Sequence, residues 1–358
     1  MKNNQKKVMN INNRLYSTSP FIFSKPSISE ISIRILILLS VQIFMLLITK
    51  SYASFTLVLC TLLGSLAAAS LNFLIYKEQP YNILAITIQG ILIGLFLPSS
   101  YPPVAAFFIT FATLFISRAI VFKNINSWIN MVSVTLIIFW CIGRNYFPDF
   151  NITKDILVLK NPSNYLSQAS VFPVYGFDSS ITAFLNTRLF SFIKVNIPEG
   201  YISLLWDTSS VIPAFRFNLI TILSSIILFA DGAFSLIIPG VFTAVYAILI
   251  RLFSPLIFGG VFNQGDIILA LCTSGTLFSA VFVIQWFGTV PETHWGKILM
   301  GLFEGIVAFF IIGAGTSSIG MVYTILFGNV FGMMLRLVEE KQSFRRINKI
   351  IGQAINVR

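Results

Sequence analysis

Two carboxylates have the type and position to do chemistry in this chain. Glu304 lies inside a long apolar stretch, where burying a charged carboxylate costs roughly 2.5–3.5 kcal/mol on insertion scales unless it is paired or hydrated. It is therefore either part of an ion or proton path, or a carboxyl near a helix end that hydrogen-bonds a neighbouring helix. Asp266 begins another apolar stretch, where a helix N-terminus stabilises an anion. It either caps that helix or belongs to the same path.

Two hydroxyl-rich patches add polar groups of a different kind. Thr273, Ser274, Gly275 and Thr276 interrupt an apolar stretch. Small residues of this kind either let helices pack closely or give a polar ligand access to backbone and hydroxyl groups inside a bundle. The second patch, Asp178-Ser179-Ser180-Ile181-Thr182, follows Tyr175-Gly176-Phe177 in a different part of the chain.

This second patch belongs to the one long polar interval of the chain, residues 144–216. The interval holds 6 Lys/Arg and 5 Asp/Glu and is nearly neutral. It has enough polar residues for short helices or a small cap, and Ile197–Tyr201 predicts a turn before an amphipathic stretch ending at Trp206.

Composition indicates a membrane protein. The chain of 358 residues is 56% hydrophobic and 10% charged, with a mean hydropathy of +0.85. Lipid can absorb this much apolar surface, whereas a soluble core cannot. The net charge of +11 is gathered largely in two tails, and basic tails beside apolar helices mark the cytoplasmic side and contact anionic lipid headgroups. The charge therefore predicts contact with the bilayer and no nucleic-acid partner.

The sequence lacks the residue patterns of metal, thiol-redox, nucleotide and hydrolase sites. Cys60, Cys141 and Cys272 are scattered through apolar stretches without metal or redox spacing, and His294 is the single histidine. The sequence contains no phosphate-binding loop, no dinucleotide fingerprint and no Ser/His/Asp set, so neither nucleotide nor soluble hydrolase chemistry is supported.

The apolar stretches predict an all-α, polytopic membrane protein with about ten transmembrane helices in two five-helix halves. The predicted spans are Ile31–Thr49, Ala53–Tyr76, Ile83–Leu97, Val104–Phe122, Trp128–Gly143, Phe217–Phe229, Ala233–Leu252, Asp266–Phe287, Lys297–Ala314 and Ser317–Val338. A count of nine or eleven stays open, because Phe217–Phe229 is short and Asp231-Gly232 is either a turn or a break within the membrane. Pro239-Gly240 predicts a kink.

These spans divide the chain into five parts. They are a basic cytoplasmic tail (1–30), a first membrane half (31–143), a long extracytoplasmic loop (144–216), a second membrane half (217–338) and a second basic cytoplasmic tail (339–358). Ten spans place both tails on one side of the membrane, as the positive-inside rule requires.

The second half resembles a known family. Gly265–Ala280, with its Thr-Ser-Gly-Thr-Leu-Phe-Ser-Ala run, looks like a helix of the RnfD/NqrB family, the membrane subunits of Rnf complexes and of sodium-pumping NADH:quinone oxidoreductases. Thr289–Lys297 is similar to that family's Asp-Pro-x-Thr…Gly loop, and Met321–Gly332 with Asn329 resembles its last helix. Ten helices with a long loop after the fifth fit the same family.

The resemblance implies flavin cofactors. The family carries FMN in a phosphoester bond to a threonine of a Ser/Thr-Gly-Ala-Thr motif in the long loop. The matching residues here are Ser179 to Thr182, with Thr182 as an exposed acceptor hydroxyl and with Ser180 and Ile181 at the Gly and Ala positions. A second flavin, such as riboflavin, is expected within the bundle, with Thr273–Thr276 as the candidate site.

The resulting functional hypothesis is a flavin-carrying subunit in the inner membrane of a bacterium. It would pass electrons between other membrane and extracytoplasmic subunits of an Rnf-type complex, coupled to movement of Na⁺ or H⁺. Two alternatives stay open. Two helical halves around a small-residue site also describe a multi-pass permease, and a divergent Rnf-like subunit without flavin would serve as a scaffold.

Overall fold

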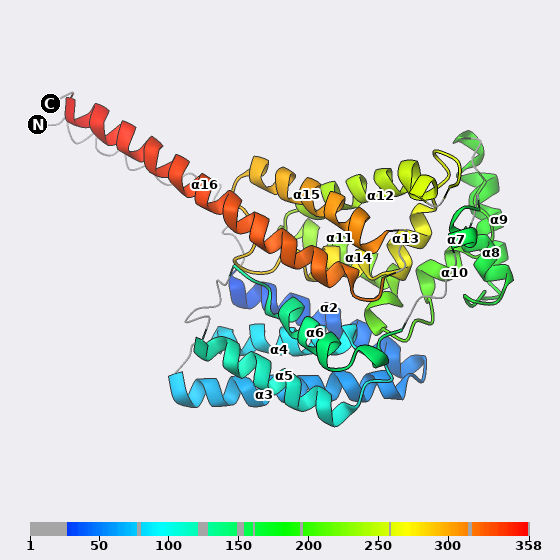
Figure 1. Ribbon diagram of the computed structural model, residues 1–358, viewed down its shortest axis with the longest axis horizontal. Coiled ribbons are helices and arrows are strands. Elements are labelled where there is room, and N and C mark those ends of the chain that lie inside the picture. Colours follow the sequence, from blue (N-terminus) through cyan, green and yellow to red (C-terminus); the bar gives the residue numbers. More distant parts are fainter. Residues whose placement is uncertain are drawn as a thin grey trace, which may run out of the picture.

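The computed structural model describes residues 27–76, 80–120, 128–148, 154–159, 162–193, 196–257, 259–313 and 317–356. Throughout these ranges every regular element is a helix (Figure 1), which confirms the all-α prediction. The predicted basic tail 1–30 lies almost wholly outside the described residues.

Nine helices and one broken pair occupy the ten predicted spans within the described ranges. The first half contains α2 (Ile28–Ile48), α3 (Tyr52–Tyr76), α4 (Pro80–Phe96), α5 (Pro103–Ile120) and α6 (Met131–Ile142). The second half contains α11 (Asn218–Ala230), α12 (Ile237–Ile257), α13 (Ile267–Thr273), α14 (Thr276–Phe282), α15 (His294–Ile312) and α16 (Gly320–Asn356). Of the described helices, α2, α3, α12, α15 and α16 are long and apolar enough to cross a membrane, and α4, α5, α6 and α11 are shorter apolar helices.

The two halves repeat one packing plan in opposite directions. In the first half α3 packs against α4 and α5, and in the second α12 packs against α13, α14 and α15. Where the halves meet, α2 lies antiparallel to α11: Arg34 near the start of α2 pairs with Asp231 at the end of α11 (3.1 Å), and Gln42 donates to Thr221 (3.0 Å). Two such inverted halves are a common plan of membrane transport proteins.

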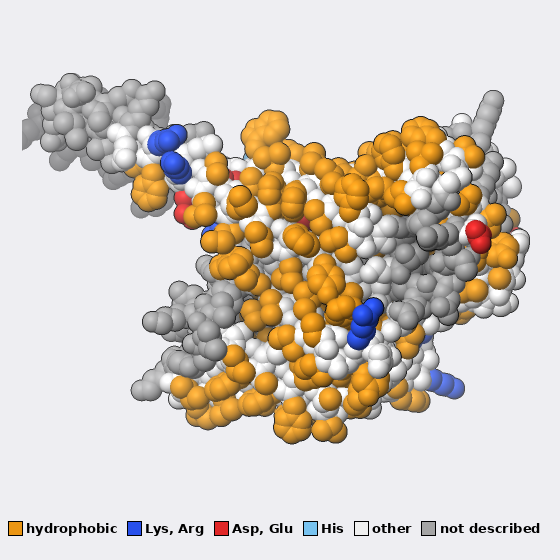
Figure 2. All heavy atoms as spheres, in the orientation of Figure 1, with side chains coloured by type: hydrophobic (Ala, Val, Ile, Leu, Met, Phe, Trp, Pro, Cys, Tyr) orange, Lys and Arg blue, Asp and Glu red, His pale blue; other side chains and the backbone are white. Residues whose placement is uncertain are grey.

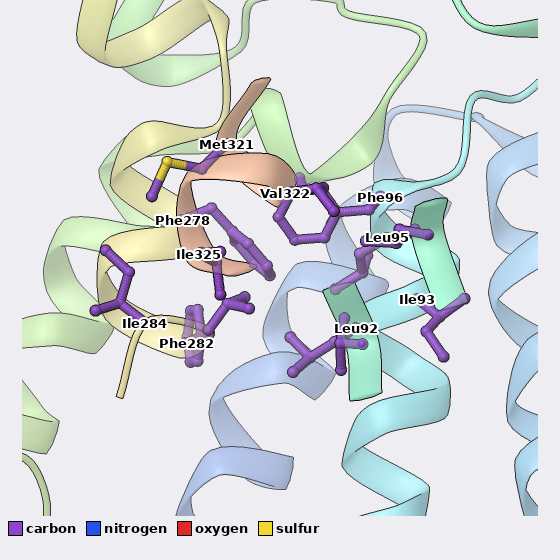
Figure 3. Packing of buried hydrophobic residues seen from close by; sticks show 14 of the residues in the cluster. Leu92, Ile93, Leu95, Phe96, Phe278, Phe282, Ile284, Met321, Val322 and Ile325 are labelled. Carbon is purple, nitrogen blue, oxygen red and sulfur yellow. The ribbon is translucent and has the colours of Figure 1, made fainter. Parts of the chain in front are cut away.

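Hydrophobic side chains fill the centre between the halves, with a group of phenylalanines among them (Figure 3). Phe96 at the end of α4 lies edge-on to Phe278 of α14, with ring centroids 5.6 Å apart, and to Phe215, 6.2 Å away. Val322 and Ile325 of α16 join the same cluster. Phe215 belongs to a short 3₁₀ turn, η3 (Pro213–Phe215), which leads into the second half.

The predicted span Asp266–Phe287 is not one continuous helix. It is broken into α13 and α14 at Ser274-Gly275, where Gly275 has φ +67°. The hydroxyl groups of Thr273 and Ser274 donate to carbonyl groups four residues earlier (2.7 and 3.0 Å), which competes with regular helical bonding. A Cβ on Gly275 would lie 2.3 Å from Cε1 of Phe215, so only glycine allows this approach.

The structure also tests the predictions made for Pro239-Gly240, for Asp231-Gly232 and for the tail 339–358. Because α12 begins at Ile237, Pro239 lies in its first turn, where proline disrupts no helical bond, so the predicted kink is wrong. Asp231-Gly232 forms the turn after α11, with Gly232 at φ +66°. The predicted tail 339–358 continues α16 as helix as far as Asn356.

The polar interval folds as a small helical cap, defined here as residues 154–206. It contains α7 (Lys154–Leu157), α8 (Pro162–Gln168), α9 (Asp178–Arg188), the turn η2 (Ser191–Ile193) and α10 (Tyr201–Trp206). The cap lies at the end of the bundle opposite the projecting end of α16 (Figure 1). Figure 2 shows that hydrophobic side chains cover most of the bundle face between these two ends, where charged side chains are few.

Candidate functional site

Glu304 lies at the middle of a membrane-length helix. Helix α15 has 19 residues and begins at His294, because the side chain of Thr293 caps its start by accepting from the backbone N–H of Gly296 (3.0 Å). Ten residues at 1.5 Å each place Glu304 about 15 Å along the helix, about half of the roughly 30 Å hydrocarbon thickness. The alternative of a carboxyl near one helix end is therefore wrong.

Glu304 has no hydrogen-bond partner among the described residues. The residue is 0% exposed, and neither carboxylate oxygen has a donor. Its side chain lies against Gly328 of α16, where a Cβ would come within 2.0 Å of Oε1. The amide of Asn329, the next residue of α16, is also buried and without a partner in the described chain. Burying a charged carboxylate without hydrogen-bond donors costs free energy, and a bound cation or a proton removes that cost.

Asp266, unlike Glu304, accepts several hydrogen bonds from protein groups. It caps α13 by accepting from the backbone N–H of Leu269 (3.0 Å), which confirms the capping interpretation. It also accepts from the N–H of Ser163 in α8 (3.0 Å) and from the hydroxyl of Tyr201 in α10 (2.9 Å). Burial, together with the nearby charge of Asp266, raises the pKa of Tyr201, so this phenol stays protonated as a donor. Asp266 therefore fastens the cap to α13.

The Thr273–Thr276 patch forms the break between α13 and α14. The hydroxyl of Thr276 donates to the carbonyl of Leu271 (2.7 Å), and Asn218 of α11 donates to the carbonyl of Cys272 (3.1 Å). The broken helix is thus held by its own hydroxyl groups and by one side chain from α11. The structure brings this patch beside Phe215 and the central aromatic cluster.

Thr182 lies in a hydrogen-bonded knot around Asp178. The Asp178 carboxylate accepts from the backbone N–H of Gly200 (2.9 Å), from the N–H and hydroxyl of Ser203 (2.6 and 2.7 Å), and from the hydroxyl of Thr182 (3.2 Å). Burial alone would raise the pKa of Asp178, but these donors together hold that pKa below its usual value. The knot joins the start of α9 to the start of α10.

The predicted exposure of Thr182 is wrong. Its side chain is 3% exposed and its hydroxyl is already a donor to Asp178, whereas Ser179 and Ser180 are exposed. A phosphoester to a flavin needs an acceptor hydroxyl that a transferase can reach. As they lie, the residues around Thr182 do not fit a covalently attached FMN.

The sequence interpretation missed one buried ion pair. Arg216 donates from Nε and Nη2 to the two carboxylate oxygens of Asp207 (2.9 and 2.6 Å), and from Nη1 to Ser51 in the turn between α2 and α3 (2.5 Å). The sequence does contain an indication of this pair, because Arg216 directly precedes an apolar stretch and follows Asp207 by nine residues. Through the bond to Ser51, the pair connects the segment that follows the cap to the first half.

The fold and the site described above define the class of this protein. Apolar helices of membrane length, arranged in two inverted halves around a broken helix and joined through a polar cap, make it a multi-pass membrane protein. The model of the NQR2, RnfD, RnfE family matches residues 15–345, and the chain belongs to that family. Membership of this family is consistent with a membrane subunit of an Rnf- or Nqr-type ion-translocating complex. Among curated proteins, none matches the chain.

Proposed function

We propose that this protein is a membrane subunit of an Rnf- or Nqr-type electron-transport complex and that Glu304 binds the transported cation, Na⁺ or H⁺, at mid-membrane. The observation that supports this role is the unpaired, fully buried carboxylate of Glu304 against Gly328. A bound cation or proton removes the cost of burying that charge, and intramembrane carboxylates without partners are typical of ion and proton paths.

The arrangement of the halves supports a transport role. Ion movement across a membrane requires a site reached from the two sides in turn, and inverted halves meeting around a broken helix are suited to such alternation. In our proposal both tails face the cytoplasm of a bacterium and the cap faces the extracytoplasmic side of the inner membrane, since the basic residues gather in the tails. Partner subunits supply the electron transfer that drives the ion.

A second flavin at Thr273–Thr276 stays a prediction from the family resemblance. A flavin on Thr182 would require the hydrogen bonds around Asp178 to open, because Thr182 is buried and its hydroxyl donates to Asp178. A permease that works alone is the competing function, and it differs in one measurable respect, because the isolated chain would move its solute without electron donors.

Substitution of Glu304 tests the proposal. In the assembled complex reconstituted into vesicles, we expect Glu304→Gln to lower donor-driven ²²Na⁺ uptake, or H⁺ uptake, by at least about tenfold, because the neutral amide cannot balance a cation. Glu304→Asp should retain partial uptake. Gly328→Ala should also reduce uptake, since the added Cβ would overlap the carboxylate.

The matched control is Glu199→Gln, which removes an exposed carboxylate on the cap and should leave uptake unchanged. Assembly of each variant is checked by the amount of complex purified. Normal ion uptake by an assembled Glu304→Gln complex would rule out the assignment of Glu304.

A further inference from the structure

Two more buried polar side chains in the bundle lack partners. Both amide atoms of Asn329 in α16, which is 1% exposed, are unpaired among the described residues, as is the hydroxyl of Ser133 in α6, which is 0% exposed. Other buried hydroxyl groups of the same two helices are paired, because Thr135 and Thr324 donate to carbonyl groups four residues earlier (2.8 and 3.0 Å). Unpaired buried polar groups in native proteins are commonly met by a water molecule or an ion.

Asn329 lies beside the Glu304 carboxylate. That carboxylate rests against the backbone of Gly328, because no Cβ separates the two helices there. Asn329 is the next residue of α16, and consecutive Cα atoms are about 3.8 Å apart. A change of side-chain rotamer alone can therefore bring the Asn329 amide toward the carboxylate.

Ser133 lies at the depth of Asn329. Helix α6 runs toward the cap and α16 runs away from it (Figure 1), and the two helices pack together. The ring of Trp140 in α6 meets that of Tyr323 in α16 edge-on, with centroids 6.2 Å apart. Ser133 precedes Trp140 by seven residues, which is about 10.5 Å along α6. Asn329 follows Tyr323 by six residues, which is about 9 Å along α16 in the same direction.

Both side chains face the boundary between the halves. Seven residues make nearly two full turns, so Ser133 shares the face of α6 on which Trp140 contacts α16. Asn329 follows Val322 by seven residues and Ile325 by four, so it shares their face, which lies in the hydrophobic cluster between the halves (Figure 3). One oxygen-bearing side chain thus comes from the first half, through α6, and two come from the second, through α15 and α16.

Depth distinguishes this group from other unpaired polar side chains of the bundle. Ser32 and Asn72 are also fully buried and unpaired within the described chain, but they lie four residues from the start of α2 and from the end of α3. Four residues are about 6 Å, so the water of the headgroup region is close to both. Asn329 lies nine residues, or about 14 Å, into α16, near the middle of the hydrocarbon core. Interfacial water therefore does not account for the unpaired groups of Glu304, Asn329 and Ser133.

We propose that Asn329 and Ser133 complete the cation site of Glu304, which then holds a Na⁺ ion through carboxylate, amide and hydroxyl oxygens from both halves. The carboxylate balances the charge, and the two neutral oxygens replace part of the hydration shell, as carbonyl oxygens do in ion channels. Amide and hydroxyl oxygens take up no proton near neutral pH, so they favour a metal cation over a proton. This inference rests on the proposed function, to which it adds two ligands and the choice of Na⁺.

Binding of ²²Na⁺ to the purified complex, without an electron donor, tests the proposal. The part of the binding that Glu304→Gln removes belongs to this site. For that part we expect Asn329→Ala and Ser133→Ala each to weaken the Na⁺ affinity by at least about fivefold, because one oxygen ligand is lost. The matched controls are Asn72→Ala and Ser32→Ala, which remove an equally buried, unpaired group elsewhere in the described chain and should leave the affinity unchanged.

Donor-driven uptake into vesicles separates a ligand from a structural role. The half-saturating Na⁺ concentration should rise in Asn329→Ala and Ser133→Ala, whereas the maximal rate should stay within about twofold of that of the unmodified complex. A purely structural effect would instead lower the maximal rate or the yield of complex and leave the half-saturating concentration unchanged.

Two results would overturn the inference. One is an unchanged Na⁺ affinity in Asn329→Ala and Ser133→Ala while Glu304→Gln abolishes its part of the binding. The other is Glu304-dependent uptake of H⁺ without Glu304-dependent binding of Na⁺, since the site would then take a proton. Failure of the proposed function itself looks different, because Glu304→Gln would then change neither binding nor uptake.

Discussion

The carboxylates of Asp178, Asp266 and Glu304 differ in what their oxygens accept. Asp178 and Asp266 receive several protein donors and hold the cap together and onto α13, whereas Glu304 receives none from the described residues. A satisfied carboxylate in a polar cap acts as a structural fastener, and an unsatisfied one in the middle of an apolar helix indicates function. Residue type alone does not separate these roles, because the separation depends on neighbours distant in sequence.

Asp178 gives a prediction about pH. Its pKa is lower in the folded protein than in the unfolded chain, so the stability that it contributes is complete above the unfolded value of about 3.9 and is lost as the pH falls below it. We expect hydrogen exchange at Gly200 and Ser203 to accelerate on acidification toward pH 3. Asp178→Asn should destabilise the cap by about 1–3 kcal/mol at neutral pH.

The control for this prediction is Asp155→Asn, which changes an exposed carboxyl in the same cap. Exchange in this variant should match the unmodified protein at neutral pH. Unaltered protection of Gly200 and Ser203 in Asp178→Asn would show that the knot does not hold the cap.

Among the elements, the broken helix shows what the sequence can and cannot predict. The spans follow from local hydropathy, so α2, α3, α15 and the membrane part of α16 were predictable to within a few residues. The break between α13 and α14 depends on Phe215 and Asn218, which reach Gly275 and the Cys272 carbonyl from elsewhere in the chain. The patch was visible in the sequence, but its partners were not.

The break itself can be tested at Gly275. We expect Gly275→Ala to lower the free energy of unfolding by more than the roughly 1–2 kcal/mol of a left-handed alanine, because the new Cβ also overlaps Phe215. Thermal unfolding in detergent measures the loss. Gly240→Ala is the control, since its Cβ meets nothing within 4 Å.

A double variant separates the two causes. Adding Phe215→Leu to Gly275→Ala should recover the steric part of the loss and leave the backbone part. No difference between the alanine variants at positions 275 and 240 would mean that the break needs no glycine.

At the scale of the molecule, the inverted halves fix which ends share a side. The cap and the end of α16 lie at opposite ends of the bundle (Figure 1), as an even number of spans with a large connection after the fifth requires. The sequence predicted this arrangement from charge and count alone. It did not predict how the halves join, because Gln42–Thr221 and Arg34–Asp231 are polar contacts between otherwise apolar helices.

Labelling of single cysteines tests the arrangement in a membrane. In a background with Cys60, Cys141 and Cys272 replaced by serine, an impermeant maleimide should label Ser179→Cys in intact spheroplasts. It should label Ser343→Cys only after lysis, because both positions are exposed but lie at opposite ends of the bundle. The reverse pattern would invert the proposed orientation, and labelling of both from one side would contradict the fold.

The contact between Arg216 and Ser51 has a consequence for biogenesis. The two residues are 165 positions apart. Ser51, in the turn between α2 and α3, can therefore bind Arg216 only after the ribosome has synthesised the whole cap. A nascent first half therefore cannot make this contact until synthesis has passed Arg216. The link between the two halves through Asp207, Arg216 and Ser51 forms only at that stage of synthesis.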